Sequence, residues 1–237
     1  NESRYIREIA ARFPDYGSLS LPDKLQLGVS RTLSYLFTRP QIIFITLALL
    51  LPVAAVARGD SRPGTMISCL PILLIVLFQP INQLMRIQPF GEKLRDWAVY
   101  VGGARHMKYG LLHFGAPDFS AAGLLLVALL GVGFLCVLLS LYFTFARSRK
   151  KALTVVGLNV LGVFSSIIMA FSPGVWFSNW RTGTFMFFSF ILTIVLIRQE
   201  LAGRSWPKLK SLDAGLFVLG GCNIGYHIVR DIIKGLT

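Results

Sequence analysis

The feature that most constrains this chain is a set of long apolar runs without a charged residue. Residues 121–143 read "AAGLLLVALLGVGFLCVLLSLYF", and residues 40–57 read "PQIIFITLALLLPVAAVA". A helix needs about 20 apolar residues to cross the hydrocarbon core of a membrane. Only 15% of all residues are charged, whereas soluble domains average about 25%. These runs predict an integral, multi-pass membrane protein.

The hydropathy pattern predicts an all-α fold, a polytopic transmembrane bundle of about six spans with additional interfacial helices. The expected spans cover residues 40–57, 66–84, 120–145, 152–172, 183–198 and 214–230. Residues 1–39 carry apolar side chains at helical spacing and predict an external interfacial lead-in. Residues 40–237 then form the bundle, with an external loop at 85–119. The last span contains polar and charged side chains, so a helix on the membrane surface is an alternative there.

Lysine and arginine predict the orientation of the spans, because cytoplasmic loops are enriched in both residues. They are densest in one set of alternate loops, residues 58–65, 146–151 and 198–213. We therefore expect loops 146–151 and 198–213 to be cytoplasmic. The lead-in, the 85–119 loop and the turn at 173–182 then share the external face.

The net charge of +13 alone would permit nucleic-acid binding. The basic residues lie almost wholly between apolar runs, as topology signals do, so we expect no nucleic-acid partner. Cys69, Cys136 and Cys222 fall in separate runs without paired spacing, which is typical of small buried side chains. His106 and His113 have no Cys, Asp or Glu at helical spacing. We therefore expect no metal site and no cofactor.

Basic and aromatic side chains are interleaved in the 85–119 loop, which includes Arg95, Trp97 and Arg105. Arginine forms bidentate hydrogen bonds to phosphate oxygens, and aromatic faces stack on sugar rings. The loop thus predicts binding of a ligand with a phosphate and a sugar. An interfacial amphipathic helix with snorkelling basic residues has the same composition and is the alternative.

Two carboxylates in this loop, Glu92 and Asp96, are candidates for a general base. Carboxylates on interfacial helices more often pair with a neighbouring cation, here Lys93 or Arg95. No second carboxylate at suitable spacing defines an acid–base pair. The catalytic residue is therefore unknown from the sequence.

The turn "FSPGVWFSNWRTGTF" at 171–185 separates the fourth and fifth predicted spans. Trp176 and Trp180 are typical of an aromatic belt and are candidate sugar contacts together with Trp97. Arg181 stands where the next helix begins, and a cation there opposes the helix dipole unless an anion shares the site. Free N–H groups at a helix start also bind phosphate. Arg181 thus predicts a phosphate site, and snorkelling to lipid headgroups is the alternative.

This turn resembles a segment in the last third of bacterial GT-C-type membrane glycosyltransferases, particularly the glucosyl-transferase-II-like proteins. In these proteins a Ser-Pro turn, a short gap and an Arg-Thr pair lead into the next span. The matching positions are Ser172, Pro173, Arg181 and Thr182, and "RTLSYLFTRP" at 31–40 is also similar. Beyond these segments the likeness rests on hydropathy and span order.

The resemblance implies transfer of a sugar from a polyprenyl-phosphate donor to a cell-envelope polysaccharide, on the external face of the bacterial plasma membrane. Arg181, Arg95 and Arg105 would then bind the donor phosphate. Such enzymes resemble one another in placing an acidic catalytic residue in the first external loop, and this chain shows no counterpart. The chain also begins without Met. We therefore expect it to be the C-terminal part of an enzyme whose upstream part, or another membrane subunit, is its partner.

A non-enzymatic polytopic membrane protein is the alternative: a transporter, a flippase or an assembly subunit. Transporters usually show ionisable groups or broken helices near the middle of the membrane. The predicted spans contain few such groups, which favours an assembly subunit over a transporter within this class.

Overall fold

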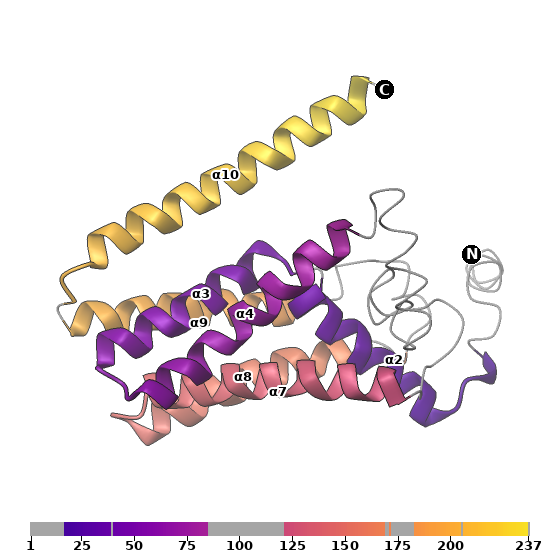
Figure 1. Ribbon diagram of the computed structural model, residues 1–237, viewed down its shortest axis with the longest axis horizontal. Helices are drawn as coiled ribbons and strands as arrows, with labels where there is room; N and C mark the ends of the chain where they lie inside the picture. Colours follow the sequence, from indigo (N-terminus) through magenta and orange to yellow (C-terminus); the bar gives the residue numbers. More distant parts are fainter. Residues whose placement is uncertain are drawn as a thin grey trace.

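The computed structural model describes residues 17–38, 40–84, 121–168, 171, 183–204 and 206–236. Within these ranges the protein is all-helical, with α-helices, one π-helix and no strand (Figure 1). The α-helices are α2 (Leu21–Leu33), α3 (Ile42–Arg58), α4 (Arg62–Leu84), α7 (Ala121–Thr144), α8 (Arg149–Ile168), α9 (Thr184–Gly203) and α10 (Leu209–Leu236), and the π-helix is η2 (Ser34–Thr38). The all-α prediction is confirmed for the described residues.

Three helices are long and apolar enough to cross a membrane: Leu124–Thr144 within α7, then α8 and α9. A fourth span results if α2 with η2 and α3, which meet at 67°, form one bent span. Each of the six predicted spans coincides with a helix. The described apolar part of α4, Arg62–Phe78, is shorter than a span. The length and apolar composition of these helices identify a membrane protein. The presence of six membrane spans stays a prediction.

The local sequence explains where the N-terminal helices begin and end. The Ser20 hydroxyl accepts from the Asp23 amide, and the Asp23 carboxylate accepts from the Ser20 amide at 2.9 Å, which together form a capping box. Pro22 in the first turn is compatible with a helix start. Gly59 ends α3 with a φ of 72°, a left-handed conformation that glycine adopts without strain.

From α3 to α9, each helix packs antiparallel to the next described helix in the chain (Figure 1). In α4 and α7, Ser68 donates to Ser140 at 3.0 Å. In α8 and α9, the Asn159 amide donates to Thr193 at 2.7 Å. Hydrogen bonds of this kind link helices where no water competes. A shared core of apolar side chains lies between the helices and includes Phe44 and Phe190, whose ring centroids are 5.3 Å apart.

The antiparallel packing gives the helix assembly two ends. The turns 59–61, 145–148 and 206–208 lie at one end, on the left in Figure 1, and we call it the basic end. Arg58 there donates to Thr144, and Lys151 pairs with Glu200 at 3.2 Å. The segments predicted to be cytoplasmic thus meet at one end. Which side of a membrane this end faces stays a prediction.

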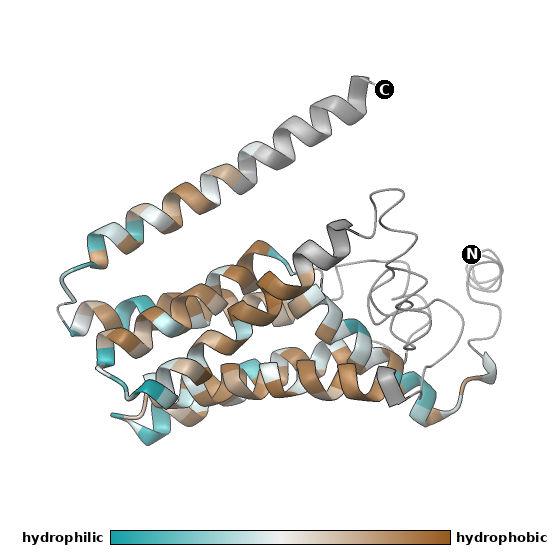
Figure 2. Ribbon diagram, viewed as in Figure 1, coloured by the Kyte–Doolittle hydropathy of each residue, from teal (hydrophilic) through white to brown (hydrophobic). Residues whose placement is uncertain are grey.

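The helices are largely apolar along their length, as the brown colouring in Figure 2 shows, and many of their large apolar side chains are exposed. Leu125, Leu161 and Phe185 are each more than 60% exposed. A soluble protein rarely exposes so many large apolar side chains together. Lipid is the solvent that such a surface requires.

Helix α10 packs on the other helices through its N-terminal part, where Leu209, Leu212 and Leu216 contact the core. Farther along it diverges from them (Figure 1). Phe217 is 83% exposed. Helix α10 thus has an apolar surface that no other described helix covers.

Candidate functional site

The side chains predicted to bind phosphate and sugar lie outside the described residues. These are Arg95, Trp97, Arg105, Trp176, Trp180 and Arg181. The structure does describe the helices on either side of them, so it shows where on the assembly the two predicted site segments are anchored.

The two predicted site segments are flanked by α4 and α7 and by α8 and α9. The helix ends that adjoin these segments all lie at the same end of the assembly. Helix α4 ends at Leu84 and α7 begins at Ala121. Ser68 contacts Ser140, and Leu74 lies against Gly133, so the two helices run antiparallel. Helix α8 ends at Ile168 and α9 begins at Thr184, again antiparallel. These four termini lie on the right in Figure 1, opposite the basic end. We call this end the distal end.

A row of buried polar side chains on α2 and η2 lies beside the distal end. Helix α2 runs inward from that end (Figure 1). Each of the following side chains belongs to a residue that is at most 5% exposed: Ser30, Arg31, Thr32, Ser34 and Thr38. The Thr32 hydroxyl donates to Ser166 at 3.2 Å, and Ser166 is in the last turn of α8. The row is therefore only a helical turn from the end of α8, after which the segment with Arg181 follows in the sequence.

Arg31 is the charged residue of this row. Its Nη2 donates to the Tyr35 hydroxyl oxygen at 3.4 Å, and its guanidinium carbon lies 5.5 Å from the centroid of the Tyr35 ring. Ionisable residues that membrane proteins retain inside are usually functional. Arg31 is therefore the strongest described candidate for binding an anion.

The π-helix η2 continues α2 through the same row. The Ser34 and Thr38 hydroxyls share a hydrogen bond of 2.6 Å, and Thr38 also donates to the Ser34 carbonyl at 3.2 Å. The wider turn of a π-helix is uncommon and occurs frequently at functional sites. The Ser30 hydroxyl is fully buried and makes no hydrogen bond with a described residue. The row thus contains a hydroxyl group that the packing of the described helices does not use.

The sequence did not single out Arg31 as a site residue, although the stretch that contains it, "RTLSYLFTRP", contributed to the family resemblance. The sequence signal that could have identified Arg31 is a charged residue within a stretch of apolar residues. Sequence alone does not distinguish a buried arginine from one that snorkels to the membrane surface, because both occur in amphipathic segments.

Other interhelical polar contacts lie away from the distal end and serve packing. Ser68 and Ser140 join α4 to α7, and Asn159 and Thr193 join α8 to α9. In the described ranges no three His, Cys, Asp or Glu side chains come together as metal ligands would. With Arg31 and the buried hydroxyls, the arrangement beside the distal end suits an anion. A described carboxylate at this end, Asp23, forms the capping box of α2 with Ser20.

Comparison with known proteins yields no match to a family model, to a curated protein or to a solved structure.

Proposed function

We propose that this chain is a membrane glycosyltransferase of the GT-C type, or the C-terminal part of one. It would move a sugar from a polyprenyl-phosphate donor to a cell-envelope polysaccharide. The observation that carries the proposal is the position of buried Arg31, beside the end where the helices flanking both predicted site segments terminate. Arg31, Arg95, Arg105 and Arg181 would surround the donor phosphate.

The reaction would be an inverting displacement at the anomeric carbon. The acceptor hydroxyl oxygen forms the new bond to that carbon as the bond to the phosphate oxygen breaks. A carboxylate base takes the hydroxyl proton, and the polyprenyl phosphate leaves with the electron pair. The arginines would stabilise the charge that develops on the leaving phosphate, which lowers the barrier. Trp97, Trp176 and Trp180 would stack on the sugar.

The finer membrane arrangement belongs to the same proposal. All six predicted spans would cross the bacterial plasma membrane as a bundle, with the basic end in the cytoplasm and the distal end outside. Support comes from the ten basic residues in loops 58–65, 146–151 and 198–213, since positive charge favours the cytoplasmic side. The distal end would then face the lipid-linked sugar and the growing polysaccharide.

Native mass spectrometry of the purified protein with a polyprenyl-phosphate sugar tests this proposal. The wild type is expected to retain the donor, and Arg181→Ala to lose it while still inserting and folding. Arg31→Gln is expected to weaken binding about tenfold through loss of a charge-assisted hydrogen bond, and Arg31→Lys to restore part of it. Arg149→Gln, an equal change of charge at the basic end, is the control. Normal donor binding by Arg181→Ala would overturn the proposed site.

A non-enzymatic membrane subunit is the second candidate, and α10 is the observation that favours it. Its uncovered apolar surface around Phe217 and Val218, which are 83% and 61% exposed, suits contact with another membrane protein. In the same experiment, absence of donor from the wild type would favour this candidate over the glycosyltransferase.

A further inference from the structure

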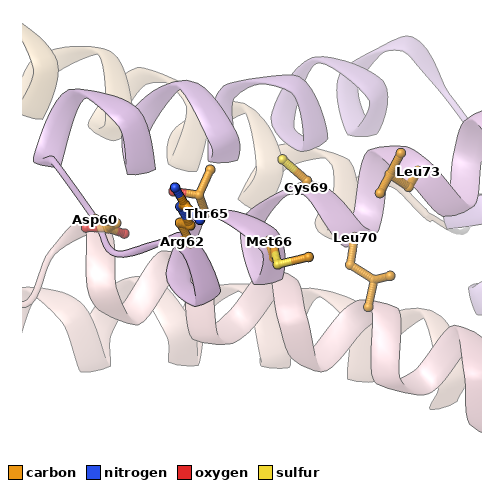
Figure 3. A pocket seen from close by; sticks show the side chains of 7 residues that line it. All are labelled: Asp60, Arg62, Thr65, Met66, Cys69, Leu70 and Leu73. Carbon is orange, nitrogen blue, oxygen red and sulfur yellow. The ribbon is translucent and has the colours of Figure 1, made fainter.

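A groove of about 550 Å³ lies where α3 turns into α4 at the basic end. Figure 3 shows its lining side chains along the first three turns of α4. The lining residues are Asp60, Arg62, Thr65, Met66, Cys69, Leu70 and Leu73. This groove lies at the opposite end from the candidate site above, so nothing in the proposed function uses it.

The groove changes from polar to apolar along its length. Asp60, Arg62 and Thr65 lie at the end next to the turn, whereas Leu70 and Leu73 line the other end (Figure 3). Met66 lies between them and is 72% exposed. A ligand that fits this gradient has a polar head and an apolar tail.

The polar end of the groove carries a positive charge. The Asp60 carboxylate pairs with Arg58, whose Nε donates to it at 2.9 Å, so Asp60 is neutralised. Arg62 has no hydrogen bond or ion pair with any described residue and is exposed. It is also the first residue of α4, and no acidic residue lies in that first turn. An anion there would interact favourably with both the guanidinium and the positive end of the helix dipole.

The surroundings of the groove are also cationic. The loops of the basic end hold three acids, Asp60, Glu200 and Asp213, and each pairs with arginine or lysine of the same end. Six cations of these loops have no ion pair with a described residue: Arg62, Arg147, Arg149, Lys150, Lys208 and Lys210. Such a surface attracts anionic lipid headgroups at about 1 kcal/mol per basic residue.

The length of the groove matches one leaflet of a membrane. From Arg62 to Leu73 the helix rises about 16 Å at 1.5 Å per residue. Half of a hydrocarbon core is roughly 15 Å deep. A chain lying along Met66, Leu70 and Leu73 would therefore extend from the headgroup level toward the middle of the membrane.

We infer that this groove is a binding site for one anionic phospholipid. The phosphodiester lies against Arg62 and Thr65, and one acyl chain lies along Met66, Leu70 and Leu73. The site discriminates between lipids by the charge of the headgroup. A zwitterionic headgroup would add its own cation to an end where six cations already have no ion pair with a described residue. It does not depend on the proposed glycosyltransferase activity.

Native mass spectrometry from nanodiscs of phosphatidylglycerol and phosphatidylcholine in equal amounts tests the inference. The wild type is expected to carry one phosphatidylglycerol through detergent exchange. Arg62→Gln is expected to lower that bound fraction about tenfold, as loss of a charge-assisted hydrogen bond predicts. Arg149→Gln removes the same charge from the same end outside the groove and is expected to keep the lipid. Circular dichroism of each variant checks that helix content is unchanged.

The tail is tested separately through Cys69, which lines the groove and is partly exposed. In a Cys222→Ser background, maleimide is expected to react with Cys69 several-fold more slowly in phosphatidylglycerol nanodiscs than in phosphatidylcholine. Arg62→Gln is expected to remove that difference. Equal lipid retention by Arg62→Gln and Arg149→Gln would overturn the site in favour of diffuse attraction. Cys69 reactivity that is the same in both lipids would overturn the placement of the chain.

Discussion

At the scale of single residues, Gly162 shows how closely α8 and α9 approach. A Cβ added at Gly162 would lie 2.4 Å from the Ser189 hydroxyl and 3.2 Å from the Cα of Met186. Ser189 is buried and donates to the Met186 carbonyl at 2.7 Å, so its side chain cannot turn away freely. Small residues at helix interfaces allow this approach in membranes.

Gly162→Ala is therefore expected to destabilise the protein by about 1–3 kcal/mol, the usual cost of overpacking. Gly157→Ala on the same helix is the matched control, since nothing lies within 4 Å of its Cβ position. The control should be neutral or stabilising by up to about 1 kcal/mol, because alanine favours a helix. Unfolding in detergent, followed by circular dichroism, measures both, and equal stabilities would contradict the close approach.

Residue-scale prediction from the sequence was least complete at Arg31. The site residues that the sequence offered come from stretches where basic and aromatic side chains are concentrated, and these lie outside the described residues. Arg31 stands out only after folding, because its burial depends on how α2 packs against α8 and the other helices. Sequence patterns report spacing along one helix and not the partner that covers it.

At the scale of elements, a small ion cluster joins α8 to α9 at the basic end. Glu200 accepts from Lys151 and from Arg204, both at 3.2 Å, and Glu200 and Arg204 side chains are 16% and 14% exposed. Lys151 also lies 5.0 Å from the centroid of the Phe145 ring. The carboxylate thus holds two cations from two helices together.

Glu200→Gln is expected to destabilise the protein by about 1–2 kcal/mol, because the largely buried Arg204 loses its counter-ion. The pair with Lys151, whose side chain is 39% exposed, adds less. Asp213→Asn is the control. Its partner Arg198 lies at 2.9 Å, but both side chains are more than a third exposed, so the loss should stay below about 1 kcal/mol. Thermal unfolding at low and high salt separates the two variants. A larger loss of stability for Asp213→Asn than for Glu200→Gln would contradict the role of this ion cluster.

The elements themselves were largely predictable. The apolar runs for all six expected spans coincide with helices, because a backbone in an apolar medium satisfies its hydrogen bonds internally only as a helix or a closed barrel. The π-helical turn at Ser34–Thr38 and the burial of Leu27 and Leu33 were not. These features depend on contacts with distant helices, of α2 with α8 and of η2 with α4, which spacing along one segment does not specify.

At the scale of the whole molecule, the loops fall into two groups, one at each end of the helix assembly, and we expect each group to lie on one side of the membrane. We expect a cysteine at 148 to react with a membrane-impermeant maleimide only from the cytoplasm, and one at 178 only from outside. Helix α8 lies between them and is apolar and long enough to cross a membrane once. Ser148→Cys and Ser178→Cys in a background without Cys69, Cys136 and Cys222 provide the test. Reaction of both from the same side would contradict it.

We propose different ligands for the two ends, a lipid-linked sugar at the distal end and an anionic phospholipid at the basic end. Photo-crosslinking with a polyprenyl-phosphate sugar that carries a diazirine beside its phosphate tests this most directly, with the labelled peptides mapped afterwards. The expected label falls on residues 31–38, 85–119 and 172–182. Label confined to 62–73 and 146–151 would place the donor at the basic end and contradict the proposed function.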